Sequence, residues 1–431
     1  MKKADIEFAV IQPLIGNVAI AGENIFGKQP KYIVTYGAPN DKLYMHYRPD
    51  VKVITMGFDN VPITEEDKTW FAKNKSCGCV IGLPVCAGLS TLTQKVRKDG
   101  TKIVGNQNDN MLLIADLAVN IIQPDVYLFE NAFQLYTNSG QEVYQGLQSI
   151  AANSNGYRTN IIKTDTQLHG IPQRRHRTFM YFFKNGNALL PWREKETLDL
   201  ESYMKKMPKS FLYQEDRTPE KFKNAFAMFI DYLEADIGKD WREHVRDKNV
   251  QSLLYYIVNF NSIDRLEAHV NNRTDQKKID FMKDYGVKFK DLIHKIKNDI
   301  SHINPFVPEI EKRGYIMAMQ WKLMGTLLHY EKDRVYNFAE SLYLMGFPSD
   351  FTFPHKDDET KQAMTTEDIS GGNHNMIFQN VPLCTAEDHV ENALLYITGE
   401  LEAITSKEIK QNNIKQTIDL MKIDSETNKL F

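Results

Sequence analysis

Hydrophobic residues in the first 195 positions fall into short runs separated by polar stretches. Such short runs, rich in β-branched and aromatic side chains, predict buried strands. The predicted strands cover residues Ile6–Ile11, Tyr32–Tyr36, Val51–Thr55, Cys79–Ile81, Val126–Phe129 and Thr178–Phe183. Helical spacing of apolar residues over Met111–Ile122, and an amphipathic pattern over Gln141–Ala151, predict helices between strands. Strands that alternate with helices indicate an α/β fold with a largely parallel sheet and helices on both faces.

The pattern changes after the break at Leu190–Trp192. Phe222, Phe226, Phe229 and Leu233 form one apolar stripe, which is typical of a helix that faces a core. We therefore predict a first domain over residues 1–195, a smaller, mainly helical domain over 196–330, a return to the first domain over 331–400, and a polar tail over 401–431.

Bulk properties narrow the class of protein. At 431 residues the chain exceeds what one core usually serves, and 42% hydrophobic with 25% charged residues argues against general disorder. No apolar run is long enough for a membrane span and the N-terminus has no leader pattern, so we expect no membrane contact. Four cysteines in so long a chain fit a reducing cytoplasm better than a disulfide framework.

Charge does not decide whether the partner is a nucleic acid. The formal net charge is only −3, but a local basic group matters more than the total. One such group follows residue 90 and consists of Lys95, Arg97, Lys98 and Lys102.

A lone cysteine, Cys86, lies in a Gly/Pro turn directly after a predicted strand. A thiol at such a corner can reach a substrate, whereas a thiol inside a strand is packing. Glu130 also follows a predicted strand, and the carboxyl ends of parallel strands meet at one edge of a sheet, where ligands bind. The spacing of Cys77, Cys79 and Cys86 fits no common zinc pattern, so we predict no metal.

Five stretches together resemble the DNA cytosine-5 methyltransferase family. The family turn Gly-x-Pro-Pro-Cys-Gln-x-Phe-Ser is matched at Gly82, Pro84, Cys86 and Ser90, and Glu-Asn-Val at Glu130-Asn131-Ala132. Gln-x-Arg-x-Arg is matched at Gln173, Arg175 and Arg177. The late elements of the family are similar to Ala339–Phe351 and, more weakly, to Phe378–Pro382.

The resemblance implies a Rossmann-like methyltransferase sheet that binds S-adenosyl-L-methionine and acts on cytosine in double-stranded DNA. It implies that Cys86 adds to carbon 6 of a flipped cytosine, so that carbon 5 can accept a methyl group. Glu130 would donate a proton to ring nitrogen 3, and Arg175 with Arg177, at alternating positions of one strand, would polarise the carbonyl oxygen. Asn131, Gln173 and Ser90 would position the substrate.

Other parts of the chain take roles from the same resemblance. Residues 91–110 would form a mobile loop over DNA, and residues 196–330 would recognise the target sequence. Arg174 and His176, which alternate with the two catalytic arginines, would be structural. A bacterial or phage-infected cytoplasm, with a restriction nuclease or partner subunit, would be the setting.

The methyl-donor motif departs most from the family. Gly16, Asn17, Asp59 and Asn380 are the candidate donor-binding residues, but the family's acidic, aromatic and glycine positions hold Val10, Gln12 and Leu14. Leu14 in place of a glycine is expected to crowd the donor pocket. Two alternatives therefore stay open: a methyltransferase-like DNA-binding protein whose donor site is lost or shared, and an enzyme that acts on tRNA cytosine or transfers another group.

Overall fold

The structure is a computed structural model of the 431-residue chain. It describes residues 5–14, 16–35, 44–45, 48–56, 64–84, 107–137, 140–154, 156–186, 188, 190–191, 193–209, 314–318, 336, 338–349, 351, 355–357, 362–363 and 380–401.

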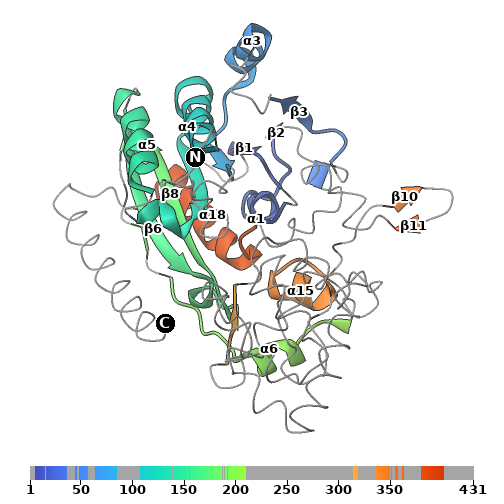
Figure 1. Ribbon diagram of the computed structural model, residues 1–431. Helices are drawn as coiled ribbons and strands as arrows, with labels where there is room; N and C mark the ends of the chain where they lie inside the picture. Colours follow the sequence, from blue (N-terminus) through green and yellow to red (C-terminus); the bar gives the residue numbers. More distant parts are fainter. Residues whose placement is uncertain are drawn as a thin grey trace, which may run out of the picture.

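A seven-stranded sheet in the order β3-β2-β1-β4-β5-β8-β6 is the centre of the fold (Figure 1). Its first five strands are parallel, whereas β8 is antiparallel to both β5 and β6. The strands are β1 (Phe8–Ile11), β2 (Tyr32–Thr35), β3 (Lys52–Thr55), β4 (Cys79–Gly82), β5 (Val126–Ala132), β6 (Tyr157–Asp165) and β8 (His176–Lys184). This mixed α/β sheet confirms the predicted fold class.

Helices cover both faces of the sheet because its strands are apolar on both sides. In β5, Tyr127 and Phe129 face one core, and Val126 and Leu128 face the other. The first core is closed by α3 (Glu65–Asn74), α4 (Gln107–Asp116), a π-helical turn over Leu117–Ile122, and α5 (Gln141–Asn153). The second is closed by α1 (Asn17–Phe26) and α18 (Leu383–Thr398), which pack against each other (Figure 1).

The described residues also form shorter elements outside the seven-stranded sheet. They are β7 (Gln173–Arg174), β9 (Ile316–Met317), α6 (Leu200–Lys205), α15 (Phe338–Leu344), β10 (His355–Asp357) and β11 (Gln362–Ala363). β7 pairs with β9 in parallel. No helix within the described ranges is long and apolar enough to cross a membrane.

Each of the predicted strands is present, with ends shifted by one or more residues. The predicted helix over Met111–Ile122 begins earlier, at Gln107, and so reaches into the segment predicted as a mobile loop. Strand β6 and helices α1 and α18 were not predicted. The apolar stripe from Phe222 to Leu233 lies outside the described residues, as does most of 196–330, so the domain division stays a prediction.

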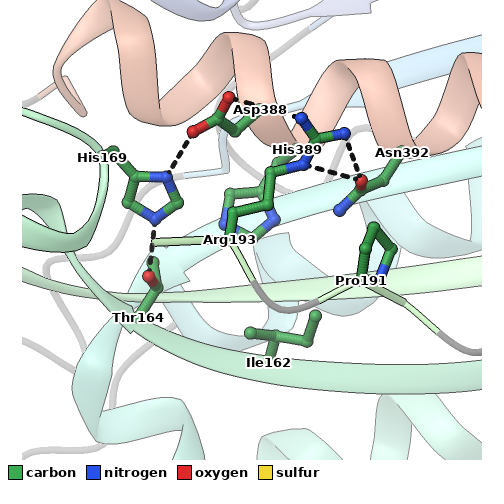
Figure 2. A pocket seen from close by; sticks show the side chains of 8 residues that line it. All are labelled: Ile162, Thr164, His169, Pro191, Arg193, Asp388, His389 and Asn392. Carbon is green, nitrogen blue, oxygen red and sulfur yellow. Dashed lines mark hydrogen bonds and ion pairs between the residues drawn. The ribbon is translucent and has the colours of Figure 1, made fainter. Parts of the chain in front are cut away.

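Helix α18 is fastened to the sheet by a buried chain of hydrogen bonds (Figure 2). His169 lies between Thr164 of β6 and Asp388 of α18: its Nε2 is 2.7 Å from Thr164 Oγ1, and its Nδ1 is 2.7 Å from Asp388 Oδ2. Lys195 Nζ donates to the other oxygen of Asp388, also at 2.7 Å. The Arg193 guanidinium donates to Asn392 Oδ1 at 2.9 Å, one turn further along α18.

A second contact fixes the same helix through an aromatic pair. The imidazole of His389 stacks on Phe179 of β8 with ring centroids 3.7 Å apart, and its Nδ1 is 2.7 Å from the Tyr181 hydroxyl. Burial lowers the pKa of His389 well below its ordinary value, so this ring is neutral near pH 7. The helix is therefore held by a neutral stacked ring as well as by the charged Asp388.

The Asp388 carboxylate should contribute strongly to stability. Burial alone would raise its pKa, but the hydrogen bonds from His169 and Lys195 hold that pKa below the ordinary value. Asp388→Asn should lower the free energy of unfolding by about 3 kcal/mol near pH 7, because it breaks a buried ion pair. Since the folded-state pKa is depressed, the difference should shrink as the pH falls below about 4.

Chemical denaturation at several pH values measures both effects. Glu391→Gln is the matched control, because Glu391 also pairs with Arg193 but its side chain is 41% exposed. That change should cost less than about 1 kcal/mol. Equal losses in the two variants would contradict the role given to Asp388.

Candidate active site

The strand order places a switch point between β1 and β4, because the chain moves outward from β1 in one direction and from β4 in the other. Ligands of open α/β sheets bind outside the carboxyl ends of the strands at such a point. There, Leu83 N donates to Ile11 O at 3.1 Å, so the segment after β4 starts against the end of β1. Cys86 and Ser90 follow within this turn but lie outside the described residues, as does Asp59.

Gly82 shapes the base of this turn. A Cβ at this position would lie 2.8 Å from the hydroxyl oxygen of Tyr127, on the neighbouring strand β5. Real Cβ contacts are not that short, so a larger residue at position 82 would require the Tyr127 ring to move.

Glu130 is the buried acid of the site. It lies near the end of β5, is 5% exposed, and has its Oε1 3.0 Å from Arg177 Nε on β8. The antiparallel register pairs Glu130 with Phe179 and Ala132 with Arg177, which brings the two charged side chains together on one face. Burial raises the pKa of Glu130, while the charges of Arg177 and Arg175 oppose that rise.

Arg175 acts on the same carboxyl from a different local structure than predicted. It lies between β7 and β8 rather than on one strand with Arg177. Its side chain is 2% exposed, and its charge lowers the pKa of Glu130. The charges of Arg175 and Arg177 therefore both act on Glu130, and the catalytic roles of the three residues stay a prediction.

Asp165, at the end of β6, organises this arginine segment, and its importance was missed in the sequence. Its Oδ1 accepts from Arg175 N at 3.3 Å, and its Oδ2 is 2.9 Å from His176 Nε2 and 3.8 Å from Arg174 Nε. Arg174 and His176 therefore face Asp165, whereas Arg177 faces Glu130. Predicting β6 as a strand would have placed Asp165 at a strand end and marked it as a candidate site residue. The polar residues of β6 kept the strand from being predicted.

Asn131 connects β5 to the turn that carries the thiol. Its Nδ2 donates to Pro84 O at 3.4 Å and contacts Met111 Sδ at 3.6 Å, and its Oδ1 accepts from Ala132 N. The side chain holds the backbone two residues before Cys86. Its predicted role in positioning the substrate stays a prediction, and the hydrogen bond to Pro84 is the contact through which Asn131 can act on this part of the chain.

Gln173 joins the arginine segment to the late Gly-Phe-Pro element. Its Nε2 donates to Leu344 O at 3.1 Å and contacts Met345 Sδ at 3.6 Å. Gly346 follows with a φ of +71°, and a Cβ there would lie 3.3 Å from Leu383 N. The segment around Gln173 and the segment that follows α15 are therefore held together, although they are far apart in sequence.

The predicted donor loop, after β1, has an unusual backbone. Gln12, Leu14 and Gly16 have φ values of +57°, +55° and +113°. The left-handed region costs a non-glycine residue roughly 1–2 kcal/mol. Leu14 keeps this conformation, and its side chain packs against the core under α1 and α18. That Leu14 crowds the donor pocket stays a prediction.

Asn17, at the start of α1, binds the residue that follows Asn380. The Asn17 side chain is fully buried, and its Nδ2 donates to Met345 O at 3.1 Å and to Val381 O at 2.9 Å. Asn380, directly before Val381, is also fully buried. Their proposed contact with a donor stays a prediction, but Asn17 clearly ties three distant segments together.

A tyrosine covers the last residue of the loop. A Cβ on Gly16 would lie 2.5 Å from a ring carbon of Tyr44. The Tyr44 hydroxyl donates to Glu23 on α1 at 2.9 Å, and Arg48 stacks on the ring and pairs with Glu23. This cluster fixes the segment after β2 over the N-terminus of α1.

The other described cysteines are poor nucleophiles. Burial raises the pKa of Cys77 and of Cys384 to about 12, and that of Cys79 well above its ordinary value. A thiol at such a pKa stays protonated near pH 7 and reacts slowly.

This arrangement combines a protonatable acid with two fixed cations in one buried place. A carboxyl whose pKa is raised gives up its proton at a higher pH than an ordinary glutamate does, and guanidinium groups can stabilise charge on a carbonyl oxygen. The fold and the described part of the site are those of an α/β protein with a buried carboxyl and arginine charges near the ends of its strands.

Comparison with known proteins identifies the class. The family model for C-5 cytosine-specific DNA methylase matches residues 58–366, well over half of the chain. The chain therefore belongs to the C-5 cytosine-specific DNA methylase family, and it is a cytosine methyltransferase. Comparison with curated protein sequences finds no match.

Several solved structures are similar to the chain at low sequence identity. A prophage-encoded protein of E. coli, described as a DNA modification methyltransferase, is 14% identical with a TM-score of 0.53, and the match covers 92% of this chain and 100% of that chain. DNMT2 of Spodoptera frugiperda is 12% identical with a TM-score of 0.48, covering 90% and 100% of the two chains. The Entamoeba histolytica methyltransferase EhMeth is 13% identical with a TM-score of 0.48, covering 90% and 98%.

Removing the charge of one arginine should shift the pKa of Glu130 in a defined direction. Arg177→Met should raise the pKa of Glu130 further, because the larger of the two opposing charges is lost while burial remains. A ¹³C NMR titration of glutamate side-chain carboxyls measures this shift, with Glu130→Gln to assign the signal. Arg174→Met is the control, since Arg174 faces Asp165, and it should leave the pKa of Glu130 unchanged. A fall of this pKa in Arg177→Met would contradict the pairing.

Proposed function

We propose that the chain methylates carbon 5 of a flipped cytosine in double-stranded DNA, with S-adenosyl-L-methionine as the donor. The observation that carries this proposal is the buried Glu130 with its raised pKa, held by Arg177 next to the strand end from which the Cys86 turn starts. An acid, a carbonyl clamp and a nearby thiol are what addition to a cytosine ring requires.

The reaction starts at the thiol. The Cys86 thiolate forms a bond to carbon 6, and the electron pair of the 5,6 double bond moves into the ring. Glu130 delivers its proton to ring nitrogen 3, so the ring becomes a neutral enamine with a nucleophilic carbon 5. When bound, S-adenosyl-L-methionine supplies an electrophilic methyl group to that carbon.

Release restores the enzyme. A base removes the proton from carbon 5, the carbon 6–sulfur bond breaks, and Cys86 leaves as the thiolate. The proton on ring nitrogen 3 returns to Glu130. Arg177 and Arg175 contribute throughout: they stabilise charge at the carbonyl oxygen and hold Glu130 in place.

A cytosine inside a duplex cannot present carbon 6 to a thiol, so the substrate base must leave the stack. We assign closure over DNA to residues 91–110 and sequence recognition to 196–330, most of which lie outside the described residues. The basic side chains after residue 90 suit contacts with phosphates. We further propose that the enzyme works in a bacterial or phage-infected cytoplasm beside a restriction nuclease.

The residues at the donor loop suit this donor. Asn17 Oδ1 is buried and has no hydrogen-bond partner among the described residues, while its Nδ2 is fully used. A buried acceptor of this kind needs a donor of hydrogen bonds and disfavours an anion. S-adenosyl-L-methionine is cationic at sulfur and carries amino and hydroxyl groups. Gly16, Asn17, Asp59 and Asn380 are the residues proposed to hold it, and Ser90, Asn131 and Gln173 those proposed to position the cytosine.

Trapping tests the nucleophile directly. DNA that carries 5-fluorocytosine should form a covalent adduct with the wild-type protein only in the presence of donor, because fluorine at carbon 5 blocks the final elimination. Cys86→Ala should form no adduct and reduce methyl transfer by at least about 10⁴-fold, while DNA affinity stays within a few-fold. Denaturing electrophoresis and mass spectrometry of product nucleosides measure both outcomes.

Cys384→Ala is the matched control for a thiol that the mechanism does not use, and it should form the adduct normally. An adduct in Cys86→Ala, or full activity in that variant, would refute the assignment. A tRNA substrate and a tritiated donor in parallel reactions identify the nucleic acid and the group transferred.

A further inference from the structure

We propose that Asp165 is a positioning residue for the reaction, because its carboxylate fixes the backbone of Arg175 and thereby the place of the Arg175 charge relative to Glu130. Asp165 lies outside the motifs that carry the family resemblance. The consequence for methyl transfer rests on the proposed function, whereas the positioning of Arg175 is tested without it.

The first observation is how the pairing of β6 with β8 ends. The last register pair is Asp165 opposite His176. One residue further, Thr166 N donates to Arg175 O at 3.2 Å, and Arg175 N donates to a side-chain oxygen, Asp165 Oδ1, at 3.3 Å. A buried backbone N–H needs an acceptor, and here a carboxylate provides it at the point where the strand is interrupted.

The second observation is that the same oxygen also holds the chain after β6. Asp165 Oδ1 accepts from Gln167 N at 3.1 Å and thereby begins the 3₁₀ turn Thr166–Leu168. Asp165 is only 6% exposed, and a carboxylate oxygen has lone pairs for both bonds. A single buried oxygen therefore joins the backbone after β6 to the backbone before β8.

The third observation is the second oxygen of the carboxylate, which faces the side chains next to Arg175 in sequence. Asp165 Oδ2 is 2.9 Å from His176 Nε2 and 3.8 Å from Arg174 Nε. The carboxylate therefore binds the residues before and after Arg175 as well as the backbone of Arg175 itself. These contacts together leave the Arg175 backbone little freedom to shift.

This arrangement bears on the buried acid through the Arg175 charge. Arg175 is 2% exposed, and its charge acts with that of Arg177 against the rise that burial causes in the pKa of Glu130. The interaction of two charges weakens as the distance between them grows, so a displacement of the Arg175 backbone alters the proton affinity of Glu130. The proposed mechanism uses that proton, and misplacing a catalytic group by about 1 Å can cost about 10²-fold in rate.

Titration of Glu130 tests the positioning without turnover. Asp165→Ala should raise the pKa of Glu130, because the Arg175 charge is no longer held in place, and the rise should be smaller than in Arg177→Met. Asp165→Asn should leave this pKa near its wild-type value, since the amide oxygen can still accept from Arg175 N. A ¹³C NMR titration of glutamate carboxyls, with Glu130→Gln to assign the signal, measures these values.

A double variant shows whether the effect passes through Arg175. Arg175→Met alone should raise the pKa of Glu130. Adding Asp165→Ala to Arg175→Met should raise that pKa little further, because the charge that Asp165 places is already absent. Fully additive rises in the double variant would overturn the inference.

Asn160→Ala is the matched control for the loss of a buried polar group from β6. Asn160 is 7% exposed and donates to Ala188 O at 3.3 Å, earlier on the same strand. This variant should lower the melting temperature without moving the pKa of Glu130. Circular dichroism verifies that each variant is folded.

If Asp165→Ala does not fold, Asp165→Glu takes its place. It keeps the charge but displaces the carboxylate by one methylene, so the pKa of Glu130 should again be higher than in Asp165→Asn. Equal pKa values of Glu130 in these two folded variants would overturn the inference.

Steady-state methyl transfer to DNA measures the consequence for the reaction. Asp165→Ala should lower kcat by at least about 10-fold while KM for DNA stays within a few-fold, and Asp165→Asn should restore most of kcat. An unchanged kcat, or an unchanged pKa of Glu130, in folded Asp165→Ala would overturn the inference and leave the proposed function intact. If the wild-type protein transfers no methyl group, the proposed function fails, and the titration still decides whether Asp165 positions Arg175.

Discussion

Burying the Glu130 carboxyl against the Arg177 guanidinium is the constraint on which the site depends. Removing an ion from water costs several kcal/mol, and the attraction of an opposite charge repays that cost only when the geometry is well defined. Here, the geometry comes from the antiparallel pairing of β8 with β5, which sets Arg177 beside Glu130 at a fixed register. A purely parallel sheet would not bring these two strand ends together in this way.

The surroundings of this pair come from parts of the chain that are distant in sequence. Gln173 holds the carbonyl of Leu344, and Asn17 holds those of Met345 and Val381. Each of these amides replaces a backbone partner that irregular segments lack, so that buried carbonyls stay paired. These segments are therefore held together by side-chain amides rather than by one continuous helix or strand. Asn17 belongs to the proposed donor loop and Gln173 to the proposed base-binding segment, and both bind the chain at residues 344–345. A displacement of one of these two regions is therefore expected to displace the other.

The hydrophobic pattern of the sequence predicted six of the seven strands of the sheet but not β6. Apolar runs such as Cys79–Ile81 and Val126–Phe129 are buried on both faces, so they stand out. β6 is hidden because its second half, from Asn160 to Asp165, includes buried polar residues whose partners come from elsewhere. For the same reason Asp165 was overlooked, although it organises the arginine segment. Motif spacing found Glu130, Arg175 and Arg177, but it could not reveal that Arg175 leaves the strand.

The pairing of α1 with α18 has a consequence for how the protein is made. The ribosome releases α1 early and α18 only after the whole intervening chain has emerged, yet both close the same core. Until then the side of α1 that packs against α18 has no cover, and Asp388 has not reached His169. Domains generally fold as units during synthesis, and exposed apolar surface attracts chaperones or other nascent chains. Nascent chains that end before residue 383 thus lack one wall of the core.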